Sequence, residues 1–198
     1  MKIKSAIFET SAPNLSGCPR LALPEFAFIG RSNVGKSSLI NLLAEQRDLA
    51  RVSDLPGKTQ LINFFTINKN WRLVDLPGYG YAHVAKTRRA DFNEAVADYI
   101  EGRENLRHVF VLIDSRLPPQ QLDVDFLGWM TGTQVPFTVV FTKIDKQSLS
   151  QAQNHIALFR RTVFAGLDPA PAVIATSAKT KAGRSEILQH IAQQLALG

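Results

Sequence analysis

Cysteine is scarce in this sequence, which has a single one, Cys18, among its 198 residues. A lone cysteine cannot form a disulfide within the chain, and nothing in the sequence places a histidine and an aspartate beside it to make it a nucleophile. Long apolar runs are absent too, because residues 109–113 and 135–141 are far shorter than the roughly 20 residues that cross a bilayer. These absences argue against a disulfide-linked scaffold, a cysteine enzyme and membrane insertion.

The N-terminus lacks the features of a secretion signal. Residues 1–17 are basic, but Glu9, Pro13 and Asn14 interrupt the continuous apolar segment that a signal peptide needs. We therefore expect a cytoplasmic protein. Residues 1–22 are expected to form an arm or an extra strand attached to one domain, residues 23–198.

Acidic residues are outnumbered: 17 aspartates and glutamates face 23 lysines and arginines, which gives a formal net charge of +6 and a pI near 9.7. Such an excess attracts polyanions such as RNA. It is equally typical of a solvated basic surface that has no partner. With 45% hydrophobic and 20% charged residues, the composition is otherwise that of a globular domain.

Short apolar segments alternate along the chain with longer segments of helical period. This pattern is typical of parallel strands joined by crossover helices, and it predicts an α/β fold of three layers. The expected strands are residues 25–29, 61–67, 71–75, 109–114, 137–142 and 172–176, and the expected helices are residues 36–45, 88–100, 119–130, 151–163 and 185–197. Three polar residues separate the second strand from the third, so these two should form a hairpin that gives the mostly parallel sheet one antiparallel edge strand.

The clearest motif follows an expected strand and precedes an expected helix; it reads Gly30-Arg31-Ser32-Asn33-Val34-Gly35-Lys36-Ser37. It matches the P-loop pattern without deviation. The glycines allow backbone N–H groups to curl round an anion, and the next helix directs its positive end at the phosphates. Lys36 is expected to reach the β- and γ-phosphates, and the Ser37 hydroxyl to ligate magnesium.

A second motif, Asp75-Leu76-Pro77-Gly78, closes the third expected strand. Alone it is a common strand-to-turn sequence. After a P-loop it predicts that the Asp75 carboxylate meets magnesium through a water molecule and that Gly78 offers its N–H to the γ-phosphate.

Two further motifs are candidates for recognising the base of a bound nucleotide. Thr142-Lys143-Ile144-Asp145 ends another expected strand, where the Asp145 carboxylate can accept from the N1–H and 2-amino groups of guanine. Lys143 can lay its aliphatic stem over the purine, and Thr176-Ser177-Ala178-Lys179 can offer backbone N–H groups to guanine O6. Each tetrapeptide alone is equally well an ordinary loop, but all four motifs in order predict a guanine-nucleotide site.

From about Ser11 onward the chain resembles the EngB/YsxC family of bacterial ribosome biogenesis GTPases, relatives of Era and TrmE with a Ras-like P-loop G domain. The resemblance is carried by the P-loop extended through Ser38 and Leu39, by Pro56-Gly57-Lys58-Thr59-Gln60-Leu61-Ile62-Asn63, and by Val74-Asp75-Leu76-Pro77-Gly78-Tyr79-Gly80-Tyr81-Ala82. It implies a GTP hydrolase with slow intrinsic turnover. Such a protein would act as a switch in assembly of the large ribosomal subunit and would be needed for normal cell division and septation.

The same resemblance assigns further residues to the site. It implies that residues 56–61 form a first switch and that a second switch starts at Gly78. Thr59 would ligate magnesium directly, as Ser37 does, while the γ-phosphate is present; Lys36, Thr59 and Gly78 would be catalytic. The nucleotide would also contact Ser38, Gly57, Lys58, Gln60 and Leu61. We expect a monomer whose partners are GTP, GDP and the large ribosomal subunit, through its RNA and proteins.

One departure affects catalysis. Ras-type GTPases have a glutamine after the second motif to orient the attacking water, and this chain has Tyr79 there. Asn33 is the residue type with which potassium-activated relatives hold a monovalent cation beside the β- and γ-phosphates, and such an ion would supply positive charge. The alternative is that Asn33 only hydrogen-bonds the loop.

Two other functions stay open at this point. In one, a bound guanine nucleotide gates attachment to RNA or to the ribosome, and hydrolysis is incidental. In the other, the P-loop belongs to an ATPase or a kinase, which competition between nucleotides would reveal.

Overall fold

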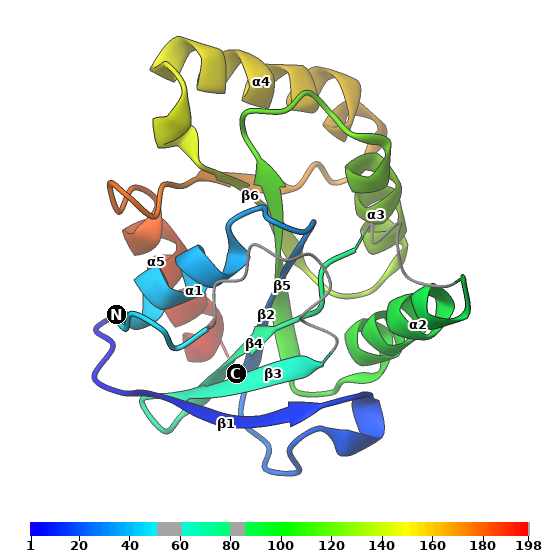
Figure 1. The fold of residues 1–198 in the computed structure, drawn as a ribbon, viewed down its shortest axis with the longest axis vertical. Helices are drawn as coiled ribbons and strands as arrows, with labels where there is room; N and C mark the ends of the chain where they lie inside the picture. Colours follow the sequence, from blue (N-terminus) through cyan, green and yellow to red (C-terminus); the bar gives the residue numbers. More distant parts are fainter. Residues whose placement is uncertain (51–60, 80–85, 198) are drawn as a thin grey trace.

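A computed structural model describes residues 1–50, 61–79 and 86–197, with the side chains of the helix that starts at Lys86 described from Glu94 onward. Its sheet has seven strands in the order β1-β3-β4-β2-β5-β6-β7 (Figure 1). The strands are β1 (Ala6–Ala12), β2 (Glu25–Gly30), β3 (Ile62–Ile67), β4 (Trp71–Asp75), β5 (Leu106–Asp114), β6 (Phe137–Thr142) and β7 (Ala172–Ala175). β2, β4, β5, β6 and β7 run parallel, whereas β3 is antiparallel to its neighbours. The predicted α/β fold with a mostly parallel sheet is confirmed.

The N-terminal segment adds a strand beyond β3. β1 pairs antiparallel with β3, with Ala6 opposite Ile67 and Ala12 opposite Ile62. Residues 6–12 of the expected arm are thus a strand, and the antiparallel strand of the hairpin lies one position inside the edge of the sheet (Figure 1).

Helices cover both faces of this sheet and complete the three layers. They are α1 (Lys36–Ala44), α2 (Lys86–Gly102), α3 (Gln121–Gly132), α4 (Leu149–Thr162) and α5 (Arg184–Ala196). α1 and α5 contribute buried side chains to the core on one face, and α2, α3 and α4 contribute to the core on the other (Figure 1). In the part of the chain that the structure describes, no helix is both long and apolar enough to cross a membrane.

The central strands are apolar on both sides because both sides are covered. In β5, Phe110 and Leu112 join the core beneath α1 and α5, while Val109, Val111 and Ile113 join the opposite core. A parallel strand buried on both faces reads as a continuous apolar run, which is the pattern that predicted these strands.

A buried network of charges holds the amino ends of β2 and β4. Glu25 is completely buried, and its carboxylate accepts hydrogen bonds from Arg72, Arg103 and the Tyr99 hydroxyl. The Arg72 guanidinium is also completely buried and donates both to Glu9 of β1 and to the carbonyl oxygen of Leu21. Buried charges are tolerated only when they are paired in this way. The network joins the N-terminal segment to the end of the sheet opposite the predicted site.

Candidate functional site

The predicted motifs meet at one edge of the sheet. Because parallel strands point their carboxyl ends to the same edge, β2, β4, β5 and β6 end side by side at Gly30, Asp75, Asp114 and Thr142. Ligands of open α/β sheets bind outside this edge. The P-loop, the Asp75 motif and both base motifs begin there.

The glycines of the P-loop are required by the backbone. A Cβ on Gly30 would lie 2.7 Å from the carbonyl oxygen of Leu112, closer than real Cβ atoms come. Gly35 has a φ of 104°, in the left-handed region that favours glycine, and it is the N-cap of α1. No side chain caps this helix end, so its first N–H groups stay directed out of the helix, where an anion can accept from them.

Lys36 and Asp75 form an ion pair between the P-loop helix and the end of β4. Their side chains are only 10% and 5% exposed. The lysine predicted to reach the phosphates and the carboxylate predicted to meet magnesium are therefore adjacent. Ser37 follows in the first turn of α1, partly exposed.

The donors at this edge suit magnesium rather than a metal that needs a full protein cage. No cluster of three or more histidine, cysteine or acidic side chains that could hold a metal is found among residues 1–50, 61–79 and 86–197. Magnesium keeps several of its waters and takes one or two protein oxygens together with phosphate oxygens. The carboxylate of Asp75 and the hydroxyl of Ser37 fit that requirement.

Lys143 links the base motif to the P-loop. Its ammonium donates to the carbonyl oxygen of Asn33 at 2.5 Å and to the carboxylate of Asp114 at 3.0 Å. Burial raises the pKa of the Asp114 carboxyl, but hydrogen bonds from Arg116 and Lys143 outweigh burial and hold this pKa below its ordinary value. Asp114 was not predicted as a site residue, although a carboxylate that ends a parallel strand is a signal for a site.

Asp145 has one satisfied and one free carboxylate oxygen. Oδ1 accepts a hydrogen bond from the Ser177 hydroxyl at 2.6 Å, and this bond lowers the pKa of the Asp145 carboxyl. Oδ2 is shielded from solvent and has no hydrogen-bond partner among the described residues. An ionised carboxylate only accepts hydrogen bonds, so Asp145 presents the acceptor that the N1–H and 2-amino groups of guanine require.

The second base motif contributes fewer backbone donors than its sequence offers. The Thr176 N–H donates to the carbonyl oxygen of Phe141, and the Ser177 N–H to that of Ala182. The Ala178 and Lys179 N–H groups have no acceptor among the described residues, so both remain available as donors. Ser177 acts mainly through its hydroxyl, which donates to Asp145 and accepts from the Thr180 N–H.

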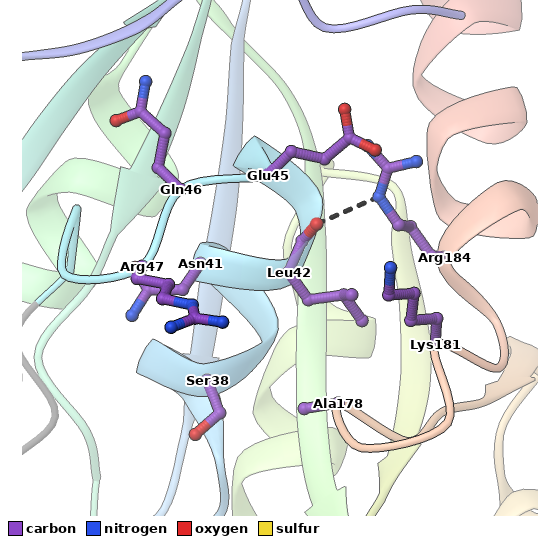
Figure 2. A pocket seen from close by; sticks show the side chains of 9 residues that line it. All are labelled: Ser38, Asn41, Leu42, Glu45, Gln46, Arg47, Ala178, Lys181 and Arg184. Atoms are coloured by element: carbon purple, nitrogen blue, oxygen red, sulfur yellow. Dashed lines mark hydrogen bonds and ion pairs between the residues drawn. The ribbon is translucent and has the colours of Figure 1, made fainter.

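A cavity of about 530 Å³ lies between α1 and the loop that precedes α5 (Figure 2). Ser38 and Ala178, both predicted to contact the nucleotide, line it together with Arg47 and Lys181. Arg184 also lines the cavity and donates to the carbonyl oxygen of Leu42 at 2.9 Å, the dashed line in Figure 2. This bond joins the start of α5 to the end of α1, a contact that was not predicted from the sequence.

Gly78 lies directly against the P-loop. A Cβ on this residue would be 2.6 Å from the carbonyl oxygen of Gly30, so no larger residue fits without displacement. The preceding Leu76 N–H donates to the carbonyl oxygen of Phe28 and extends the contact of β4 with β2. Tyr79, which stands where Ras-type GTPases have a glutamine, points to α3, and its hydroxyl donates to the Asp123 carboxylate at 2.9 Å.

Part of the predicted site falls outside the described residues: Gly57, Lys58, Thr59 and Gln60. The same holds for Gly80 and Tyr81, which belong to the expected second switch. Leu61 is described, is exposed and directly precedes β3. Asn33 has a φ of 59°, and its side chain is exposed and forms no hydrogen bond with a described residue.

Comparison with known proteins agrees with this geometry. A protein-family model described as "50S ribosome-binding GTPase" matches residues 25–143. The "Probable GTP-binding protein EngB" of Flavobacterium johnsoniae is 47% identical over 192 residues, which cover 96% of this chain and 91% of the relative. The protein of the same name from Porphyromonas gingivalis is 47% identical over 191 residues, covering 96% of this chain and 95% of the relative.

Solved structures show the same fold. The crystal structure of a probable GTP-binding protein EngB has a TM-score of 0.67 at 24% identity, and the match covers 88% of this chain and all of that one. Era in complex with MgGDPNP and a segment of 16S ribosomal RNA also has a TM-score of 0.67, at 20% identity, over 88% of this chain and 57% of Era. The relatives are GTP-binding proteins, which favours the guanine site over the alternative of an ATPase or kinase. The chain belongs to the EngB family of P-loop GTPases, and its activity is the hydrolysis of GTP.

Proposed function

We propose that this GTPase is a switch, read through the γ-phosphate, in assembly of the large ribosomal subunit in the cytoplasm. The observation that supports the proposal is the close approach of Gly78 to the Gly30 carbonyl, because Gly78 is the residue at which we expect the second switch to start. A backbone N–H at that place senses whether a γ-phosphate is present, and the residues after it transmit the difference.

At the phosphate site, we expect the bound nucleotide to replace the ion pair between Lys36 and Asp75. With nucleotide bound, Lys36 would turn from Asp75 to the β- and γ-phosphates, and the Asp75 carboxylate would be free to hold magnesium through water. Ser37 and Thr59 would be the direct protein ligands of that ion. Magnesium, when bound, neutralises charge on the β- and γ-phosphates. The ion pair between Lys36 and Asp75 supports this proposal, because it shows that the Asp75 side chain reaches the lysine of the P-loop.

The base site selects guanine through Asp145, with Ala178 donating to O6 and the stem of Lys143 against the purine. Asn33 is the proposed ligand of a potassium ion that helps hydrolysis. Its exposed side chain, without a described protein partner, supports this over a role in bonding the loop.

The large ribosomal subunit is the proposed partner for two reasons. The family model that matches residues 25–143 describes a GTPase that binds the 50S subunit. The net charge of +6 favours a polyanionic partner such as ribosomal RNA. A cell with too few completed subunits would then fail in normal division and septation.

Cosedimentation with purified large subunits tests the switch. A non-hydrolysable GTP analogue should retain several-fold more protein on the subunits than GDP does, and added salt should weaken retention in both states. The matching ATP analogue is the control, because adenine has no donor pair for Asp145. Equal retention with GDP and with the GTP analogue would remove the γ-phosphate from the proposal.

A further inference from the structure

Asp123, in the first turn of α3, faces the two segments that meet at the phosphates. Its carboxylate accepts a hydrogen bond from the Tyr79 hydroxyl at 2.9 Å and lies 3.9 Å from the Arg31 guanidinium of the P-loop. Asp123 is 3% exposed, so this carboxylate is removed from water and depends on these partners. One buried acid therefore contacts both the P-loop and the residue that follows Gly78.

Tyr79 is held by more than its hydroxyl. Its ring stacks on Phe126 of α3 with centroids 4.3 Å apart and planes 12° from parallel, and only 7% of the residue is exposed. Burial and the Asp123 charge raise the pKa of the Tyr79 hydroxyl well above its ordinary value, so it remains a donor at any physiological pH. Tyr79 is thus fixed to α3 at both its ring and its hydroxyl.

This anchorage bears on the neighbouring residue. Gly78 lies so close to the Gly30 carbonyl that a Cβ has no room, and the next residue in the chain is the anchored Tyr79. A peptide group between two fixed points has little freedom to turn its N–H away from the phosphate loop. Preorganised donors stabilise charge without reorganisation during the reaction.

We propose that Asp123 and Tyr79 are positioning residues for GTP recognition and hydrolysis: their hydrogen bond holds the Gly78 N–H in line for the γ-phosphate. The inference rests on the proposed contact of Gly78 with that phosphate. Tyr79 in place of a glutamine then has a role of its own, which is to fix the backbone rather than to orient water. Arg31 faces the same carboxylate and so ties the P-loop to α3.

The test is the ratio of affinities for a GTP analogue and for GDP in the variant Tyr79→Phe. The substitution keeps the ring on Phe126 and removes only the hydroxyl. Affinity for the GTP analogue should fall about tenfold, the scale of a hydrogen bond to a charged group, and affinity for GDP should stay constant. The rate of hydrolysis of bound GTP should fall with it.

The matched control is Tyr99→Phe. Tyr99 is also buried and donates to a buried carboxylate, that of Glu25, at 2.8 Å, but at the opposite end of the sheet. Both variants should lose thermal stability, and only Tyr79→Phe should change the ratio of affinities. An unchanged ratio in Tyr79→Phe, with stability lost as in Tyr99→Phe, overturns the positioning role.

Two more variants separate this inference from the proposed function. Gly78→Ala places a methyl group against the Gly30 carbonyl and should itself lower the ratio of the affinity for the GTP analogue to the affinity for GDP. If Gly78→Ala lowers the ratio and Tyr79→Phe does not, the γ-phosphate contact stands and the positioning role fails. If Gly78→Ala leaves the ratio unchanged, both fail. Asp123→Asn keeps an oxygen that accepts from the Tyr79 hydroxyl, so it should retain most of the preference for the GTP analogue over GDP. Asp123→Ala removes this acceptor and should lose that preference.

Discussion

The Lys143 ammonium donates to the Asn33 carbonyl oxygen across 2.5 Å, so a side chain of the base motif is bonded to the backbone of the phosphate loop. The same ammonium contacts Asp114 at the end of the strand between them. One side chain therefore links the motif of residues 142–145 to the P-loop.

Lys143→Met should release nucleotide faster. Methionine keeps an apolar stem of similar length but loses the bonds to Asn33 and Asp114. Hydrogen bonds to charged groups contribute about 1.5–3 kcal/mol each, so affinity for GDP should fall on the order of tenfold to a hundredfold. Stopped-flow release of a fluorescent GDP measures the effect. Lys146→Met, which changes an exposed lysine three residues away, is the control, and equal release from both variants would contradict the coupling.

Asp145→Asn should shift the base preference from guanine to xanthine. The carboxamide can donate to the carbonyl group that xanthine has where guanine has its 2-amino group. Competition between GDP and xanthosine diphosphate, read from the displaced fluorescent nucleotide, checks the shift. Retained preference for GDP in this variant would exclude Asp145 from the base contact.

Ser177→Ala should make GDP binding more sensitive to acid. The hydrogen bond from Ser177 lowers the pKa of Asp145, and the carboxylate must be ionised to accept from guanine. Binding is therefore present above this pKa and lost as the pH falls through it. Removing the hydroxyl returns the pKa toward its ordinary value near 3.9, so the loss should begin at higher pH.

GDP affinity measured from neutral pH downward shows where that loss begins. The control is Ser148→Ala. Ser148 caps α4 through its Oγ, which accepts from the Gln151 N–H, so this variant should lower stability without changing the pH at which GDP binding begins to be lost. The same onset in Ser177→Ala and wild type would show that Ser177 does not set this pKa.

Acid should also destabilise the fold through His108. Burial, with the His190 ring beside it, lowers the pKa of His108 to about 3, and its Nε2 is 2.9 Å from the Thr138 hydroxyl. In the unfolded chain this pKa is about 6.5, so between these values the unfolded state binds the extra proton. The free energy of unfolding should decrease as the pH falls below about 6.5, by up to about 1.4 kcal/mol per pH unit from this group.

Denaturant unfolding at several pH values measures this slope. His108→Gln should flatten the slope whatever it does to the stability at neutral pH, and His155→Gln, at a less buried histidine, should leave it unchanged. A slope that His108→Gln does not alter would assign the acid sensitivity to other groups.

The sequence predicted the central strands better than the edge. β4 and β6 agree residue for residue with the predicted ranges, because strands buried on both faces are continuous apolar runs. β5 begins at Leu106, three residues earlier than predicted, since His108 breaks the apolar pattern although it is buried against Thr138. In β1 an irregular register between Phe8 and Thr10 disturbs the alternation that would reveal a strand.

The motifs of the site were predictable because short segments determine their backbone shape. The contacts that tune the site were not, because they join residues that only the tertiary fold brings together. Lys143 and Asp114 are 29 positions apart, and Tyr79 and Asp123 are 44 apart. One local signal was missed at the start of α4. Ser148 and Gln151 form a capping box, and the sequence pattern S-x-x-Q predicts such a box at a helix N-terminus.

The buried charges around Glu25 affect how deletion experiments are designed. A protein shortened to start at Leu23 loses Glu9 and the Leu21 carbonyl, which leaves the fully buried Arg72 short of three of its four acceptor contacts. Removing one partner of a buried ion pair costs about 3–5 kcal/mol, a large part of the stability of a typical domain. Loss of ribosome binding in such a protein would report partial unfolding. An N-terminal contribution to binding is better mapped with surface substitutions at exposed Ile7 and Phe8.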